Sequence, residues 1–137
     1  MLSRITQMKR DSVFADIGIT GTQHGYILAV CREPGITQHA LAHKLFVNKS
    51  NVARQIAQLD EQGYLTKRAD PDDKRMIRVY PTDKAWTVYP LIERILEDWN
   101  AYLQKDMSVK ERETLSGLLS GVLKRAVDAL GERDFEE

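Results

Sequence analysis

Two short helix signatures followed at once by two strand signatures occupy residues 37–80, and this order restricts the fold more than any other feature of the chain. Thr37 and Asn48 are favourable N-caps, and Gly63 suits the left-handed conformation in which helices commonly end. A polar loop separates the two strand candidates, which are Tyr64–Arg68 and Met76–Tyr80. Two short helices before a hairpin predict a winged helix-turn-helix.

Helical periodicity continues on both sides of this region. Apolar residues recur at helical spacing in Leu2–Phe14 and Thr22–Arg32. Further along, Thr82 is the N-cap of a long helix, and Ser108, with a glutamate three residues later, begins another with a capping box. These flanking helices carry more apolar surface than one small domain needs to cover. We therefore expect a mainly α fold with a small β-hairpin wing.

The length and composition indicate one soluble domain. The chain has 137 residues, and no run approaches the ~18 apolar residues that a membrane span requires. Residues 1–10 lack the apolar core of a signal peptide, so we expect a cytoplasmic protein with no membrane partner. The only cysteine, Cys31, excludes an intrachain disulfide.

The charge is zero overall but uneven along the chain. Residues 36–80 contain eight Lys or Arg and five Asp or Glu, whereas residues 81–137 contain eight and twelve. Nucleic acid responds to a local basic patch rather than to the total charge, so this distribution allows DNA binding. An imbalance of this size also arises by chance.

The helix after Asn48 offers a surface suited to the major groove. If Val52, Ile56 and Leu59 face the core, the opposite face is small or polar and free of acid before Asp60. Ser and Asn side chains hydrogen-bond to base edges, and Arg binds guanine through two bonds. The alternative is an ordinary solvated helix face.

The hairpin adds a basic tip. Five cationic residues surround the acidic loop 70–73; they are Lys67, Arg68, Lys74, Arg75 and Arg78. An arginine at such a tip is suited to the minor groove, where the negative potential is strong. Asp73 is placed to orient Arg75 by a charge-assisted hydrogen bond. The alternative is a charged hairpin tip with no partner.

The run from residue 34 to 82 resembles the winged-helix core of the MarR (multiple antibiotic resistance regulator) family. The shared features are I-T-Q…L-A…L, then N-K-S…V-A-R…L…G-Y-L, then R…D-P-x-D-x-R and a strand that ends in Thr. The most diagnostic element is Asp73-Lys74-Arg75. The motifs span about a third of the chain, and the helix order matches over nearly all of it.

This resemblance implies a sequence-specific, DNA-binding transcriptional regulator, most often a ligand-responsive repressor on a pseudo-palindromic operator. It implies a homodimer and a single domain, 1–137, in which helices in 1–17 and 83–131 dimerise and 20–81 form the DNA-binding core. By position, Ser50, Asn51 and Arg54 would contact bases, and Arg75 would enter the minor groove with Asp73 orienting it. The implied phosphate contacts on double-stranded DNA are Gln38, Lys44, Lys49 and Arg68.

Three other features have competing interpretations. His39 and His43 have a metal-ligand spacing, but surface or DNA-facing histidines are favoured and no metal or cofactor is predicted. Cys31 lies in an apolar helix, so a buried, inert thiol is favoured over a redox sensor. A pocket for a small aromatic or phenolic effector is implied by the resemblance. Its candidate residues are Tyr26, Trp86, Tyr89 and Trp99, although aromatic residues at helical spacing belong more often to the core.

No constellation for catalysis is apparent, so we do not expect an enzyme. Two rival functions remain. One is a winged-helix adaptor that binds proteins and never DNA, for which Arg54 and Arg75 would be dispensable. The other is a metal-dependent regulator or metalloenzyme built on His39 and His43, which metal analysis of the purified protein would reveal.

Overall fold

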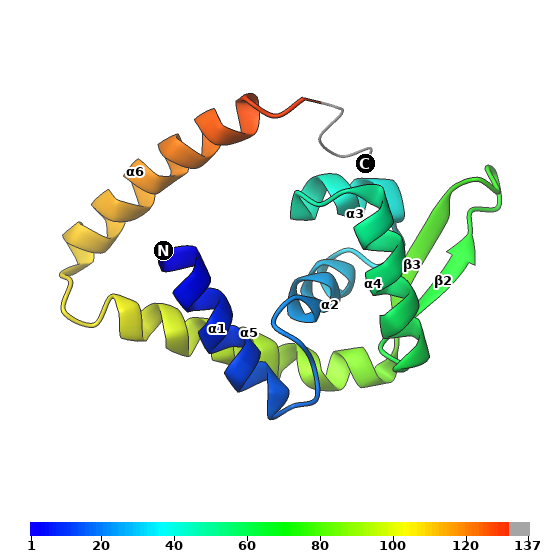
Figure 1. Cartoon of the computed structure of the whole chain (residues 1–137), viewed down its shortest axis with the longest axis horizontal. Helices are drawn as coiled ribbons and strands as arrows, with labels where there is room; N and C mark the ends of the chain where they lie inside the picture. The colour runs from blue at the N-terminus through cyan, green and yellow to red at the C-terminus, as the bar shows by residue number, and fades with distance from the viewer. Residues whose placement is uncertain (132–137) are drawn as a thin grey trace.

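A computed structural model, which describes residues 1–131, contains a winged helix-turn-helix with helices on both sides (Figure 1). This confirms the predicted fold class. The order is α1 (Leu2–Ala15), α2 (Gln23–Arg32), β1 (Ile36–Thr37), α3 (Gln38–Leu45), α4 (Lys49–Glu61), β2 (Leu65–Ala69), β3 (Ile77–Pro81), α5 (Asp83–Leu103) and α6 (Val109–Asp128).

The helices α3, α4, α5 and α6 start where the sequence predicts them, because a side-chain cap fixes each of these starts. The side chains of Thr37, Asn48 and Thr82 each accept a hydrogen bond from the backbone N–H three residues later. Ser108 and Glu111 form the predicted reciprocal capping box at α6.

The wing is a three-stranded antiparallel sheet in the order β1-β3-β2 rather than a simple hairpin. β1 was not predicted, since a strand of two residues shows no alternation of apolar and polar residues in the sequence. Ile36 pairs with Val79 in β3, and the Gly35 N–H donates to the Val79 carbonyl at 2.8 Å. Gly35 has φ +87°, and a Cβ there would lie 3.3 Å from the Tyr80 ring, so this turn requires glycine.

One hydrophobic core joins α2, α3, α4, the sheet and the first half of α5. Nearly all of α2 is buried within it, and α4 contributes Val52, Ile56 and Leu59, each fully buried. α5 enters the same core through Ala85, Val88 and Ile92. We call residues 20–81 the winged core.

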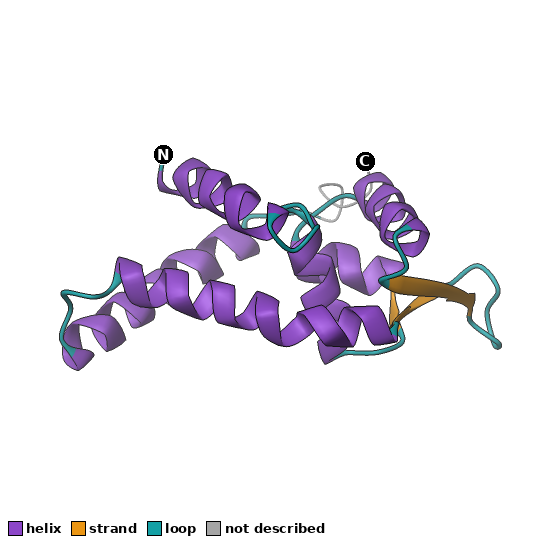
Figure 2. Cartoon of the chain, turned by 90° about the horizontal axis from the view of Figure 1, so that it is seen from below, coloured by secondary structure: helices purple, strands orange, loops and turns teal. Residues whose placement is uncertain are grey.

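The helices α1 and α6, which we call the arms, are covered far less. None of the residues of α6 is buried, and α1 buries only Phe14. Figure 2 shows the α5–α6 turn and the wing at opposite ends of the molecule. Within residues 1–131, no helix combines the length and apolar character needed to cross a bilayer.

Candidate nucleic-acid interface

The outward face of α4 carries the residues predicted to contact bases. Ser50 and Arg54 are exposed and Asn51 is half-buried, on the side opposite the buried stripe. The Arg54 guanidinium donates to the Asn51 side-chain oxygen, and the Ser50 hydroxyl donates to Asn48 at 3.1 Å. The polar groups of this face are therefore held in place by one another before any partner arrives.

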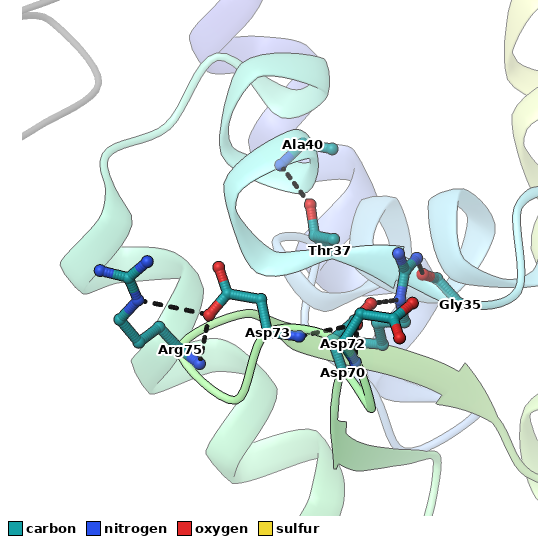
Figure 3. A network of polar contacts seen from close by, with 8 residues as sticks. Gly35, Thr37, Ala40, Asp70, Asp72, Asp73 and Arg75 are labelled. Carbon is teal, nitrogen blue, oxygen red and sulfur yellow. Dashed lines mark hydrogen bonds and ion pairs between the residues drawn. The ribbon is translucent and has the colours of Figure 1, made fainter.

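The tip of the wing carries Arg75 with its guanidinium almost fully exposed, at 92% of its side-chain surface. Asp73 accepts hydrogen bonds from both the backbone N–H and Nε of Arg75, at 3.1 and 3.3 Å (Figure 3). The predicted contact between the two is thus present. An exposed guanidinium held by a neighbouring carboxylate retains free N–H donors for an anionic partner.

An ion pair that was not predicted from the sequence lies where the two long strands meet the wing tip. Arg78 donates through Nε to Asp70, which is 6% exposed, and through Nη1 to the Gly35 carbonyl at 2.8 Å. The hydrogen bond from Arg78, followed by that from the Asp72 backbone N–H, holds the pKa of Asp70 below its usual value. The contact with Asp70 confirms that Arg78 lies beside the acidic loop 70–73, whereas its bond to Gly35 was not predicted.

Three elements meet in a groove of about 280 Å³ between the wing and the helix-turn-helix. Three residues from the predicted set line it together: Gln38 from α3, Lys49 from α4 and Arg75 from the wing. Thr37, His39, Met76 and Ile77 complete its wall. A groove lined by cationic and hydrogen-bonding groups, beside the start of α4, is suited to a phosphate.

Two predicted phosphate contacts lie outside this groove and have partners within the chain. The Lys44 ammonium lies 3.0 Å from a Glu33 carboxylate oxygen, in an exposed pair. The Arg68 guanidinium lies 4.8 Å from the centre of the Tyr80 ring. Both side chains are on the surface.

Three of the four residues predicted to line an effector pocket, Tyr26, Trp86 and Tyr89, lie on α2 and α5. Tyr26 is 2% exposed in the core, where burial raises the pKa of its hydroxyl. Trp86 is 46% exposed and lies edge-on to Tyr89, with ring centres 5.7 Å apart. Tyr89 in turn accepts a hydrogen bond from Arg32 at 3.4 Å.

A cavity of about 520 Å³ lies instead between α1 and α5. Its charged lining is Lys9, Arg10 and Asp98, and its aromatic lining is Tyr102 and Trp99, the fourth residue predicted for an effector pocket. Within residues 1–131, the buried Arg10 Nε and Trp99 Nε1 have no hydrogen-bond partner. Unpaired buried donors are uncommon, since each costs about 1–3 kcal/mol.

Cys31 was the candidate for a redox site, and His39 and His43 were the candidates for a metal site. Cys31 is buried, and burial raises the pKa of its thiol to about 11, which suppresses the reactive thiolate. The His39 and His43 rings lie 4.7 Å apart. In the part of the chain that the structure describes, no three His, Cys, Asp or Glu residues are grouped as metal ligands.

Comparison with known sequences connects this geometry to gene regulation. The sequence model of the MarR family matches residues 17–76. An HTH-type transcriptional regulator of Bacillus subtilis (strain 168), YybA, is 32% identical over 136 residues, which cover 99% of this chain and 87% of that protein.

Solved structures agree with the sequence matches. The transcriptional regulator SlyA is 30% identical, with a TM-score of 0.89 over 93% of this chain and 90% of that one. A MarR-family regulator from Listeria monocytogenes, solved in complex with a 26mer DNA, is 26% identical, with a TM-score of 0.87 over 93% and 85% of the two chains. All three relatives are named as transcriptional regulators rather than enzymes.

Proposed function

This chain belongs to the MarR family of transcriptional regulators, and we propose that it represses transcription in the cytoplasm as a homodimer on a pseudo-palindromic operator. The observation that carries the proposal is the groove that Gln38, Lys49 and Arg75 share. Residues from both helices of the helix-turn-helix and from the wing converge there, although they are far apart in sequence. One stretch of duplex backbone would fill this groove while α4 enters the major groove.

The proposed division of labour follows from position. Ser50, Asn51 and Arg54 read base edges in the major groove, and Arg75, oriented by Asp73, enters the minor groove. Phosphate contacts supply affinity and salt dependence rather than sequence preference. They come from Gln38, Lys44, Lys49 and Arg68.

Selection of bound duplexes from a random DNA pool tests the proposal. We expect a palindromic consensus whose half-sites lie one helical turn, ~34 Å, apart. Arg54→Ala should cost about 1–3 kcal/mol at the base pair that it reads and relax preference there. Arg75→Ala should weaken binding with little change in thermal stability, whereas Arg125→Ala on α6 is the matched loss of charge and should change neither. A pool that yields no enriched sequence would favour the protein-binding adaptor instead.

We further propose that the α1–α5 cavity receives a small aromatic anion that releases DNA. Lys9 and Arg10 supply positive charge, Trp99 and Tyr102 supply stacking faces, and two buried N–H groups lack partners. A ligand carboxylate or phenolate would be attracted by the charges of Lys9 and Arg10, and its ring would lie against the indole.

Benzoate, cyclohexanecarboxylate and benzamide separate the contributions of ring and charge. In a Trp86→Phe background, Trp99 is the only tryptophan and reports directly on the cavity. Benzoate should quench its fluorescence at lower concentration than either of the other two and should weaken binding of the selected duplex. Equal responses to all three compounds would contradict this ligand class.

A further inference from the structure

A polar network lies at the base of the wing tip, and its central residues, Asp70 and Arg78, make none of the DNA contacts proposed above. It centres on Asp70, the residue directly after β2. One carboxylate oxygen of Asp70 accepts from the backbone N–H groups of Asp72 and Asp73, at 2.8 and 3.2 Å. The Asp70 N–H donates to the Met76 carbonyl at 2.9 Å. Asp70 therefore closes the tip on itself.

Arg78 connects this closed tip to the helix-turn-helix. Its Nε donates to the second carboxylate oxygen of Asp70, and its Nη1 donates to the Gly35 carbonyl. Gly35 belongs to the turn that leads through β1 into α3. One planar guanidinium thus joins two segments that are 43 residues apart. A lysine ammonium lacks this rigid fork and is a poor substitute.

The same network reaches Arg75 at the far end of the tip. Asp70 holds the backbone of Asp73, and Asp73 holds Arg75 through two hydrogen bonds (Figure 3). Without such support, an exposed arginine on a loop would sample many positions, and binding would have to order it at a cost in affinity.

We propose that Asp70 and Arg78 are positioning residues that hold the wing tip, and with it Arg75, at a fixed place relative to α3 and α4. This inference rests on the proposed DNA-binding function. Neither side chain needs to touch DNA in this role. Arg78 instead adds to the pairing of β1 with β3 a side-chain connection between the wing tip and the turn that leads into α3.

Asp70→Asn gives a test in which positioning and simple electrostatics have opposite signs. The amide keeps an oxygen for the Asp72 and Asp73 N–H groups but loses the ion pair with Arg78. Removing a negative charge near DNA would strengthen binding if only charge mattered. Positioning predicts binding to the selected duplex that is about three- to ten-fold weaker. Asp72→Asn is the matched control, because Asp72 joins the network through its backbone N–H, and its loss of charge should leave binding unchanged or slightly stronger.

Arg78 is tested by coupling to a residue that it reaches only through Asp70 and Asp73. Arg78→Gln and Arg78→Lys should both weaken binding by about three- to ten-fold, although the lysine variant retains the charge. In the Arg78→Gln background, Arg75→Ala should cost roughly three-fold less than it does in the wild-type protein. Circular dichroism of each variant at the assay temperature checks that the chain remains folded.

The outcomes separate this inference from the function on which it rests. Stronger binding by Asp70→Asn, full affinity in Arg78→Lys, or additive effects of Arg75 and Arg78 would each overturn the positioning role. In all three cases the wild-type protein would still bind its selected duplex. Failure of the wild-type protein to select any duplex would instead overturn the proposed function.

Discussion

The recognition helix α4 and the arm helix α6 carry similar apolar stripes in sequence, but the stripe of α4 is buried and that of α6 is exposed. The stripe of α4, Val52, Ile56 and Leu59, is fully buried within its own chain. On α6, Leu119 and Leu123 are 57% and 59% exposed. The apolar stripe of α4 is thus covered within one chain, whereas α6 exposes Leu118, Leu119, Val122 and Leu123. Large exposed apolar patches mark interaction surfaces. In our proposal a second copy covers this face of α6.

The largest effect is expected from making the exposed apolar face of α6 polar. Leu119→Glu combined with Leu123→Glu should abolish the dimer, since each buried leucine contributes about 1.5–3 kcal/mol, or on the order of 6–12 kcal/mol for the four in a dimer. Sedimentation equilibrium measures the change. Lys124→Glu, a charge change at an exposed neighbour, is the control. A double variant that remains dimeric would show that this face is not the interface.

A substitution in the stripe of α4 should act on folding rather than on assembly. Ile56→Ala should lower the free energy of unfolding by about 2–5 kcal/mol, because it leaves a cavity in a fully buried site. Gln58→Ala, at an exposed position of the same helix, should change it by less than about 0.5 kcal/mol. Urea unfolding followed by circular dichroism distinguishes them. Similar losses for both would mean that α4 is not anchored as described.

The joint between arm and core should respond to pH through His24. Its ring stacks on Phe14 of α1 at 4.7 Å and bonds to the Gly21 carbonyl. Burial lowers its pKa, with a further contribution from Arg10, and outweighs the opposing effects of the Gly21 bond and Asp11.

The unfolded chain therefore binds a proton more readily than the folded one. Stability should be complete above about pH 6.5 and should fall at lower pH, by at most about 1.4 kcal/mol per pH unit. Unfolding titrations across this range measure the slope. His24→Gln should flatten it, and an unchanged slope in that variant would assign the effect to other groups.

The smallest expected effects concern the caps that begin the two helices. Asn48→Ala and Ser108→Ala should each cost about 1 kcal/mol. In the winged core the loss should appear in global unfolding, because α4 is anchored by its buried stripe. In α6 it should appear first as faster hydrogen exchange over the first turn. Identical exchange patterns for the two variants would show that α4 and α6 are anchored alike.

The sequence predicted features that depend on neighbouring residues and missed features that depend on residues far apart in the chain. The caps at Thr37, Asn48, Thr82 and Ser108 were predicted because each depends on residues three positions apart. The contact between Asp73 and Arg75, which are two positions apart, was predicted because it is also local. By contrast, β1 exists only because Ile36 meets Val79, and no periodicity signals a strand of two residues.

The missed parts of the site are likewise non-local. The bond from Arg78 to Gly35 and the groove that unites Gln38, Lys49 and Arg75 depend on chain folding over tens of residues. Sequence spacing placed Arg78 beside the acidic loop. It gave no indication of which carboxylate Arg78 contacts or that Arg78 also binds Gly35. Trp99 was a candidate for an effector pocket, but the cavity between α1 and α5 was not predicted, because its walls come from helices that are far apart in the chain.

The two-residue strand β1 leads directly into α3 while pairing with β3 of the wing. In the proposed function α4 enters the major groove and Arg75 enters the minor groove. The distance between them is thereby set within each subunit. We therefore expect the reach within a half-site to be constant, so that regulation can alter only the separation of two such units. An operator recognised by this protein would tolerate changes in the spacer between its halves more readily than insertions within either half.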